Sequence, residues 1–396
     1  MSVQGVTGDN FLVSRRADFW FVGGASIAFW AVCHLLEFLN PHYTTANSLI
    51  NNVPALFAMF SVIVNAPHFM ASYHLAYTRG VPFILQNWFQ LIAVPLLLAT
   101  ALVMGDLMFG LSIDAWSSFG RWLNDLLDPL GIFLVIGVFQ NFGEEVVHQL
   151  ITIMYLTVGW HYVKQVFGCF MVYSRFDGYA LSGEERNLVK ASLLSIWGFN
   201  FFSDNIALNP VDFFTGKAIT HVFPVTVYQF FELFTVFLFL MVGYRIFYRR
   251  YRDHGELPPA AAVVAWVAIF IWWMPFARSL TFFIFAVPFF HGLQYLPFYK
   301  KIIDSRHNDP SVSSRSFTFY FSFLVVAGFV AFYIGPETVD LLRESESRLQ
   351  MTYWMAGIAL FINIHHFFID NTLWRFRDHN VRRWLFQEPA GSSGAR

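Results

Sequence analysis

The chain has 396 residues, of which 56% are hydrophobic and only 13% are charged, and it contains 49 Phe, 16 Tyr and 13 Trp. Soluble domains carry roughly 25% charged residues, so this composition excludes a soluble globular protein and predicts an integral membrane protein. The formal net charge of -1 identifies no partner, because orientation in a membrane depends on how Lys and Arg are distributed among the loops. Cys33 and Cys169 both lie in apolar segments, which argues against a disulfide framework and excludes a CxxC metal site.

Apolar segments recur along the whole chain. A helix needs roughly 20 residues to cross a bilayer. Segments that reach or approach this length occur at residues 17–39, 50–77, 84–104, 130–174, 187–203, 218–246, 259–276, 279–299, 316–335 and 351–370. We therefore predict an all-α polytopic membrane bundle of about ten transmembrane helices. Because the fourth segment is too long for one straight helix and contains Gly143-Glu144-Glu145, we expect residues 130–142 to be a broken or re-entrant piece.

The loop charges predict the orientation. Basic clusters follow the even-numbered segments: Arg79; Arg175, Arg186 and Lys190; Arg245, Arg249, Arg250 and Arg252; Lys300, Lys301, Arg306 and Arg315; Arg375, Arg377, Arg382 and Arg383. Acidic residues dominate two of the opposite loops, so the positive-inside rule places both termini in the cytoplasm. We expect a cytoplasmic N-terminal segment at 1–16, one transmembrane domain at 17–374, and a basic, partly disordered cytoplasmic tail at 375–396. The expected location is a bacterial inner membrane.

Six histidines fall at one depth of this topology. They lie on the second, fourth, eighth and tenth segments: His68, His74, His161, His291, His365 and His366. Each precedes the next cytoplasmic basic cluster by between 5 residues (His74 to Arg79) and 14 residues (His161 to Arg175). At about 1.5 Å of rise per residue, they share a slab roughly 15 Å deep. Imidazole is the commonest metal ligand and suits iron, copper and zinc, so we predict a buried metal site, with a redox metal favoured.

The last of these segments adds a carboxylate to the histidines. Asp370 follows His366 by four residues and therefore shares its helix face. The adjacent His365 points elsewhere, and His74 lies about 120° around the helix from His68 unless Pro67 distorts the turn or two metals are present. We therefore expect one member of each pair to form hydrogen bonds instead. The first-ranked ligands are His68, His161, His291 and His366, with His74, His365 and Asp370 as further ligands or supporting groups.

Polar neighbours accompany the histidines at helical spacing. Lys164 and Gln165 follow His161 at three and four residues, Gln294 and Tyr295 follow His291 at the same offsets, and Asn65 precedes His68 by three. Such side chains orient imidazoles and fix their tautomers. We expect Lys164, Gln165 and Tyr295 to orient ligands, relay protons or hold bound oxygen. Glu145 and His148 form an E-x-x-H pair of the kind found in di-iron bundles, but with one copy only, and their membership of the site stays open.

Histidines spread over several spans near the cytoplasmic face resemble the architecture of histidine-rich integral-membrane oxygenases, a group that includes fatty acyl desaturases, alkane and sterol hydroxylases and bacterial carotene dioxygenases. The resemblance implies non-haem iron and the oxidation of lipid-soluble substrates with dioxygen. The HxxxH and HxxHH boxes of desaturases are absent from this chain. The resemblance therefore implies a class of reaction and no specific activity.

These observations predict a membrane oxidoreductase with one or two non-haem iron ions, copper or zinc being the other candidates. We expect the lipid bilayer, a hydrophobic small-molecule substrate and a separate electron-donor protein as partners, and no nucleic acid. One alternative is a transition-metal or proton-coupled transporter that uses the same histidines. A second alternative is a haem or quinol protein, in which two histidines would ligate the haem and four would stay unexplained.

Overall fold

The computed structural model describes residues 10–39, 56–57, 59–109, 142–202, 225–274, 283–342, 352–375 and 378–387. The regular structure of these residues is helical, with no β-strand among them. The prediction of an all-α protein is therefore confirmed. Residues 130–141, where a broken or re-entrant piece is predicted, lie outside the described ranges.

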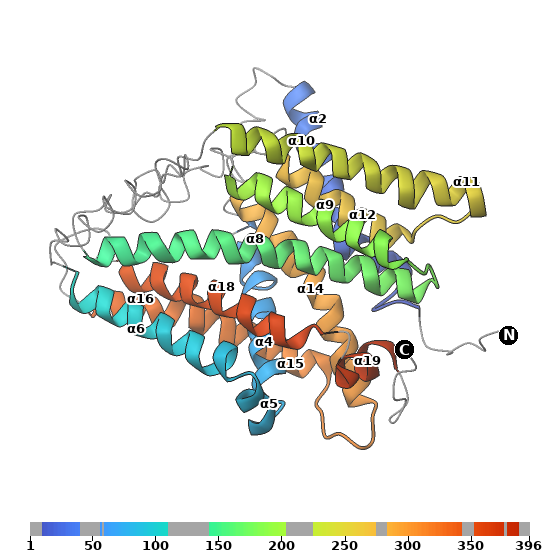
Figure 1. The fold of residues 1–396 in the computed structure, drawn as a ribbon. Coiled ribbons are helices and arrows are strands. Elements are labelled where there is room, and N and C mark those ends of the chain that lie inside the picture. Colours follow the sequence, from blue (N-terminus) through green and yellow to red (C-terminus); the bar gives the residue numbers. More distant parts are fainter. Residues whose placement is uncertain are drawn as a thin grey trace.

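The elements follow one another as α-helices with short π-helical segments, labelled η (Figure 1). The first half contains α1 (Arg15–Phe19), η1 (Trp20–Gly24), α2 (Ala25–Leu39), α4 (Asn65–Tyr77), α5 (Val81–Gln86), η2 (Phe89–Ala93), α6 (Val94–Leu107), α8 (Phe142–Phe176) and α9 (Gly183–Phe202). The second half contains α10 (Val225–Val242), η5 (Gly243–Arg249), α11 (Arg250–His254), α12 (Ala260–Trp273), α14 (Phe283–His307), α15 (Phe317–Phe329), η6 (Val330–Ile334), α16 (Gly335–Leu341), α18 (Tyr353–Leu373) and α19 (His379–Phe386).

Each of the ten predicted apolar segments overlaps at least one of these helices. Four helical stretches in the described ranges are long and apolar enough to cross a membrane: Arg15–Leu36, Phe89–Leu107, Thr226–His254 and Phe317–Leu341. This supports a membrane protein but is fewer than the ten crossings predicted. Length does not exclude α8, α14 and α18, which have 35, 25 and 21 residues. These three helices carry buried imidazole, amide and carboxylate groups, which lower their mean hydropathy.

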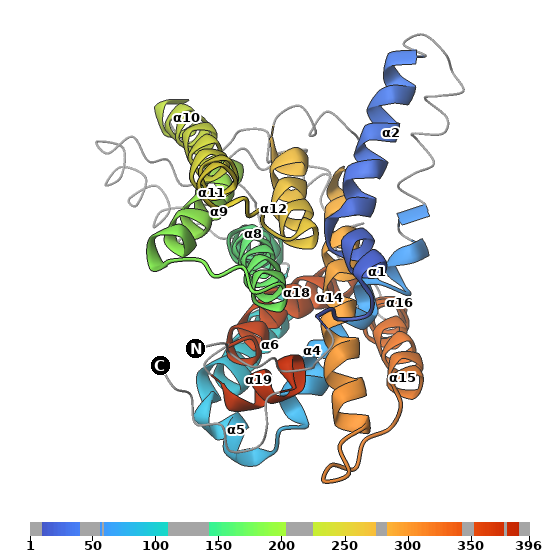
Figure 2. The same cartoon turned by 90° about the vertical axis from the view of Figure 1, so that its right-hand side faces the viewer.

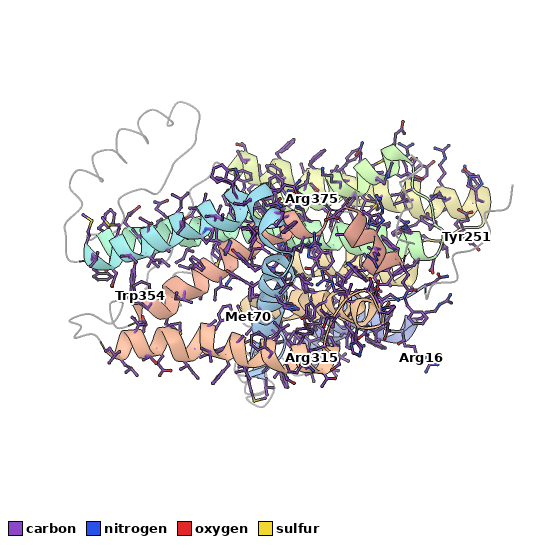
Figure 3. The ribbon with its side chains drawn as sticks, turned by 90° about the horizontal axis from the view of Figure 1, so that it is seen from below. Arg16, Met70, Tyr251, Arg315, Trp354 and Arg375 are labelled. Atoms are coloured by element: carbon purple, nitrogen blue, oxygen red, sulfur yellow. The ribbon has the colours of Figure 1, made fainter. Side chains whose placement is uncertain are left out.

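The long helices pack in a layered order around α8. Helix α10 lies on α9, α9 on α8, and α18 and α6 cover the other side of α8 (Figure 1). In the perpendicular view α8 is seen nearly end-on, whereas α2 and α14 are seen from the side and run from top to bottom (Figure 2). Helix α18 passes α4 on its way from Trp354 toward Arg375, and Met70 marks α4 near that crossing (Figure 3). The centre of the molecule is thus approached by helices from more than one direction.

Hydrophobic burial holds these layers together. The largest cluster joins α8, α9 and α12 around Trp266 and Phe170, both nearly inaccessible to solvent. A second cluster joins α6, α8 and α18 around Tyr353, and a third joins α4, α14, α15 and α18 around Tyr299. Burying an aromatic side chain of this size contributes on the order of 2–3 kcal/mol. The histidines of α4, α8, α14 and α18 therefore sit on helices fixed by packing on several sides.

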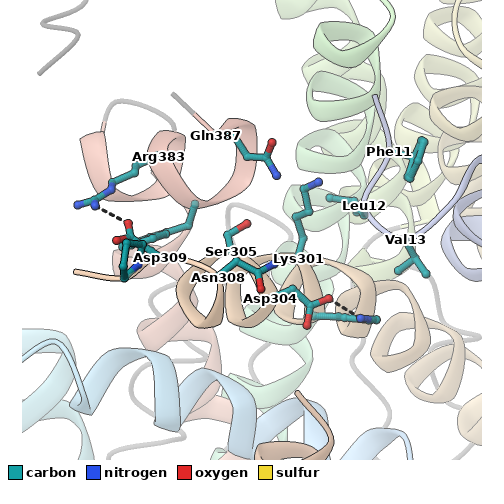
Figure 4. Close-up of a pocket in the computed structure, with 13 residues that line it drawn as sticks. Phe11, Leu12, Val13, Lys301, Asp304, Ser305, Asn308, Asp309, Arg383 and Gln387 are labelled. Atoms are coloured by element: carbon teal, nitrogen blue, oxygen red, sulfur yellow. Dashed lines mark hydrogen bonds and ion pairs between the residues drawn. The ribbon is translucent and has the colours of Figure 1, made fainter. Parts of the chain in front are cut away.

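The basic tail forms an unexpected short helix, α19. Its Val381 and Leu385 are buried. Arg383 Nη2 forms an ion pair at 2.5 Å with Oδ2 of Asp309, a residue that follows α14. A pocket of about 620 Å³ lies between α14, α19 and the segment that precedes α1, and Lys301 and Gln387 contribute to its wall (Figure 4). Part of the tail is therefore ordered against the end of α14, while residues 388–396 lie outside the described ranges.

Candidate metal centre

Four histidines from four helices converge at one buried point. His68 comes from α4, His161 from α8, His291 from α14 and His366 from α18. One potential ligand atom from each can be chosen so that all four lie within 4.8 Å of one another. All four side chains are buried. This is the group that could hold a metal ion among the described residues, and its members are the four histidines ranked first from the sequence.

Two distances within the group match those between ligands of one ion. His366 Nε2 lies 3.2 Å from His68 Nε2 and 3.1 Å from His161 Nε2. Nitrogen ligands that bind one ion at about 2.0–2.1 Å are roughly 2.9–3.4 Å apart in octahedral or tetrahedral geometry. The imidazole rings meet edge to face, with centroids 4.7 Å apart for both pairs. The observed separations are therefore those of neighbouring ligands around one centre.

The tautomer of His68 can be derived from its partner. Its Nδ1 lies 2.7 Å from the carbonyl oxygen of Asn65, which can only accept, so Nδ1 donates and Nε2 presents a lone pair. His366 Nε2 has two close nitrogen neighbours but can act toward them only as a donor or only as an acceptor. It cannot form well-directed hydrogen bonds with both His68 and His161. A cation between the three nitrogen atoms would satisfy their lone pairs together.

Asp370 provides an oxygen at the edge of the group. Its Oδ2 lies 3.6 Å from Nε2 of both His161 and His366 and has no hydrogen-bond partner among the described residues. Its Oδ1 accepts a hydrogen bond from Ser72 Oγ at 2.6 Å, and Ser72 Oγ in turn lies 2.8 Å from the hydroxyl of Tyr295. Since Ser72 donates to the carboxylate, Tyr295 donates to Ser72. This chain holds one carboxylate oxygen and leaves the other facing the imidazoles.

His291 is positioned mainly through its backbone and ring face. Gln165 Nε2 donates to the carbonyl oxygen of His291 at 3.0 Å and to Gln294 Oε1 at 2.9 Å. Gln294 Nε2 donates to the carbonyl oxygen of Val22 in η1 at 2.6 Å. The ring of Tyr162 stacks on His291 with centroids 4.1 Å apart. His291 Nε2, buried and without a hydrogen-bond partner among the described residues, is left for the centre.

A glycine allows α4 and α14 to approach closely. A Cβ on Gly292 would lie 3.3 Å from both Asn65 Cα and His68 Nδ1, which is tighter than ordinary contact. Helix α4 begins only at Asn65, after a turn at residues 62–64, so Pro67 falls in its first turn, where its missing N–H costs little. The break before Asn65 and the small residue opposite it bring His68 beside His291, at a ring separation of 5.1 Å.

His74 and His365 lie apart from the group. His74 Nδ1 is 2.9 Å from the hydroxyl of Tyr299, and its ring contacts Tyr320 of α15. Both ring nitrogens of His365 are engaged, with Nδ1 2.8 Å from the Tyr73 hydroxyl and Nε2 3.1 Å from the carbonyl oxygen of Gln90. Because that carbonyl only accepts, Nε2 donates and Nδ1 accepts from Tyr73. Neither residue belongs to the four-histidine group, and both form hydrogen bonds beside it, the role expected for one member of each pair.

The remaining predicted residues take different places. Lys164 does not reach the imidazole group; its Nζ contacts Asn371 Oδ1 closely, and the residue lines a cavity beside the site. Glu145 Oε1 accepts a hydrogen bond from Gln149 Nε2 at 2.6 Å. Neither Glu145 nor His148 belongs to the four-histidine group, and His148 lies 13 residues before His161 on α8, about 20 Å along the helix.

Some contributors were not identified from the sequence. Ser72 and Asn371 are small polar residues in apolar helices, and a signal existed for each, since Ser72 follows His68 by four residues and Asn371 follows Asp370 directly. Tyr73, which holds His365, gave no such signal among 16 tyrosines.

Comparison with known proteins assigns no relative to this arrangement. No protein-family model matches the chain, and no curated protein or solved structure matches it significantly. The function must therefore be argued from the site itself.

Proposed function

We propose that this protein is an integral-membrane, metal-dependent oxidoreductase that acts on a hydrophobic substrate. The observation that carries the proposal is the convergence of four buried imidazoles, with ligand atoms within 4.8 Å of one another, beside the unpaired Oδ2 of Asp370. Ionisable clusters inside membrane proteins are costly and mark functional sites. Hydrogen bonding between helices alone gives no reason for four imidazoles to meet at one point.

Iron is the metal we propose, with copper or zinc as the other candidates. Imidazole and carboxylate ligands suit all three ions, whereas thiolates, which are typical of closed structural zinc sites, are absent from the group. When bound, a non-haem iron ion would supply the redox chemistry with dioxygen that is expected of membrane oxygenases. The residues that would hold it are His68, His161, His291 and His366, with Asp370 as a fifth ligand or as a charge partner.

Substrate access is supported by a cavity that reaches the centre. A cavity of about 510 Å³ is lined by His161, Tyr295 and Asp370, by several further polar residues, and by apolar residues of α8, α9, α14 and α18. This volume falls in the range of about 300–1,000 Å³ that is usual for small-molecule sites. The apolar part of this wall suits a hydrophobic molecule.

The chain's own residues suggest a route for protons. Tyr295 donates to Ser72 and Ser72 donates to Asp370, so a proton can pass along hydrogen bonds from the cavity wall to the carboxylate. Lys164 lines the same cavity and is proposed to face the substrate. Gln165 holds the backbone of His291 and is proposed to be a positioning residue.

We further propose that all ten apolar segments cross the membrane, with both termini in the cytoplasm of a bacterial cell and the centre in the cytoplasmic half of the bilayer. The basic residues Arg16 in α1, Arg315 just before α15 and Arg375 just after α18 all lie away from Trp354 in Figure 3. No reductase domain is found in the described residues, so electrons for an oxygenase reaction are proposed to come from another protein.

The geometry argues against the haem alternative. The two axial ligands of a haem approach the iron from opposite faces of a macrocycle. Here the rings of His161, His291 and His366 lie edge to face, with centroids 4.7 to 4.8 Å apart. No space for a macrocycle separates them.

Metal analysis together with an optical spectrum of the detergent-purified protein tests the proposal. Stoichiometric iron without a Soret band is expected. A Soret band would support a haem protein, and protein from metal-replete cells without bound metal would eliminate the enzyme proposal. Bound metal without any redox response would favour the transporter. A His291→Ala variant that keeps full metal content would contradict the ligand assignment.

A further inference from the structure

The cavity beside the centre combines apolar walls with an excess of positive charge. Phe167, Leu193, Leu194, Phe298 and Phe367 line it together with Lys164 and Lys190. Asp370 is the only carboxylate that the described residues contribute to its wall. Since Oδ1 of Asp370 is bound by Ser72 and Oδ2 faces the imidazoles, this carboxylate does not neutralise the lysines by direct contact.

A third cation belongs to the same region. Lys164 Nζ contacts Asn371 Oδ1, and Arg375 Nε donates to the carbonyl oxygen of Asn371 at 2.9 Å. The Lys164 ammonium lies within electrostatic range of Asp370, Arg375 and Lys190. Within the described part of the chain, no carboxylate forms an ion pair with any of these three cations. Three cations near a single carboxylate leave an excess of positive charge, and this repulsion is relieved when an anion binds among them.

We propose that this cavity takes an amphiphile with a long hydrocarbon chain and an anionic head group, either a carboxylate or a phosphate. The proposal rests on the proposed function, whose substrate class it names. The head group lies between Lys164 and Lys190, and the hydrocarbon chain lies among Leu193, Leu194 and Phe367. Lys164 follows His161 by three positions on α8, which is about 4.5 Å of helical rise, so a head group bound there stays close to the metal centre.

Gly168 offers a way to block the cavity without touching the centre. It lines the cavity, and a Cβ added to it would meet no atom within 4 Å. A Gly168→Ala change is therefore tolerated, whereas Gly168→Phe would place a ring in the open space. Lys190 lies on α9, which carries none of the proposed metal ligands, so its charge can be removed while the centre stays intact.

The experiment measures binding of fluorescent polyene amphiphiles to the purified full-length protein in a nonionic detergent. Three probes share one hydrocarbon chain and end in a carboxylate, a phosphate monoester or an alcohol. We expect the wild type to bind at least one anionic probe about tenfold more tightly than the alcohol, equivalent to about 1.4 kcal/mol. The preference for an anionic probe should shrink at high salt, because Lys164 and Lys190 are exposed to solvent.

The lysine variants test the role of charge, and the Gly168 variants test the role of cavity volume. Lys190→Gln is expected to reduce the preference for anionic probes over the alcohol probe. The double variant Lys164→Gln/Lys190→Gln is expected to abolish this preference, and Lys190→Arg is expected to retain it. Gly168→Phe should weaken the binding of all three probes, whereas Gly168→Ala should bind them as tightly as the wild type does. Equal binding of anionic and neutral probes by the wild type, or an anionic preference that survives the double Gln variant, would overturn the proposal.

Metal content measured in the same samples distinguishes this proposal from the proposed function. If metal is absent and the lysine-dependent anionic preference persists, the oxidoreductase proposal fails while the binding site stands. If metal is stoichiometric and no anionic preference exists, the substrate class is wrong while the metal centre stands.

Discussion

The Nε2 atoms of His161 and His366 lie 3.1 Å apart, although 205 positions separate the two residues in the chain. The contact joins α8 to α18, whose packing is reinforced by the hydrophobic cluster around Tyr353. An imidazole pair at this distance is either a hydrogen bond or two neighbours of one cation. The additional contact of His366 Nε2 with His68 Nε2, at 3.2 Å, favours the cation.

Adjacent histidines on α18 provide a matched pair of variants. His366→Ala removes a proposed ligand, so metal affinity should fall by more than the 10–100-fold typical of losing an outer hydrogen-bond partner. His365→Ala should keep stoichiometric metal but lower the free energy of unfolding by about 1–3 kcal/mol, because Tyr73 and the Gln90 carbonyl lose their partner. Metal analysis and thermal unfolding in detergent measure both effects. Equal metal loss in the two variants would refute the assignment.

Ser72 is expected to tune the centre through Asp370. Ser72→Ala removes the hydrogen bond to Oδ1, so metal affinity should fall about 10–100-fold with the four histidines intact. Tyr295→Phe should have a smaller effect, since Ser72 can still donate to the carboxylate. Competition with a metal chelator measures the affinities.

Ser195→Ala is a suitable control for this series. Ser195 is also a buried helical serine, but its Oγ bonds the carbonyl oxygen of Ser192 in its own helix. A Ser195→Ala variant should retain the wild-type affinity. An unchanged affinity in Ser72→Ala would remove the proposed role of the Tyr295, Ser72 and Asp370 chain.

The close approach of α4 and α14 at Gly292 should be sensitive to added volume. Gly292→Ala places a methyl group 3.3 Å from His68 Nδ1 and Asn65 Cα, and Gly292→Val adds two further carbons. Forcing such groups into a packed contact costs about 1–3 kcal/mol, and displacement of His68 should lower metal occupancy, more for Val than for Ala. Gly243→Ala, where an added Cβ meets no atom within 4 Å, is the control. Full occupancy in Gly292→Val would show that His68 does not depend on this contact.

The convergence of four histidines could be predicted from the sequence, but the partners of the other two could not. Loop charges and helical rise placed His68, His161, His291 and His366 at one level. The direction of His74 depends on where α4 begins, and the break at residues 62–64 is set by tertiary packing that Pro67 alone does not reveal. His366 could be chosen over its neighbour His365 because it shares a helix face with Asp370, but the partners of His365, which are the Tyr73 hydroxyl and the Gln90 carbonyl, depend on tertiary packing.

The fold was predictable at the level of element type. Long apolar segments predicted helices, because a lipid-exposed backbone must satisfy its hydrogen bonds internally. The number of crossings does not follow from composition alone, since the helices that carry the site are the more polar ones. Helix α19 was not predicted, because its burial depends on contacts with α14 that lie far away in the sequence.

The attachment of α19 should depend on pH through Asp309. Hydrogen bonds from the hydroxyl and backbone N–H of Ser311, and then from Arg383, hold the pKa of Asp309 below its ordinary value. A depressed carboxyl pKa stabilises the folded protein above the ordinary value of about 3.9, and this contribution is lost as the pH falls through the folded-state value. Asp309→Asn should therefore have a lower thermal denaturation midpoint than the wild type near neutral pH, with the difference vanishing in acid. A difference independent of pH would show that the ion pair does not hold α19 in place.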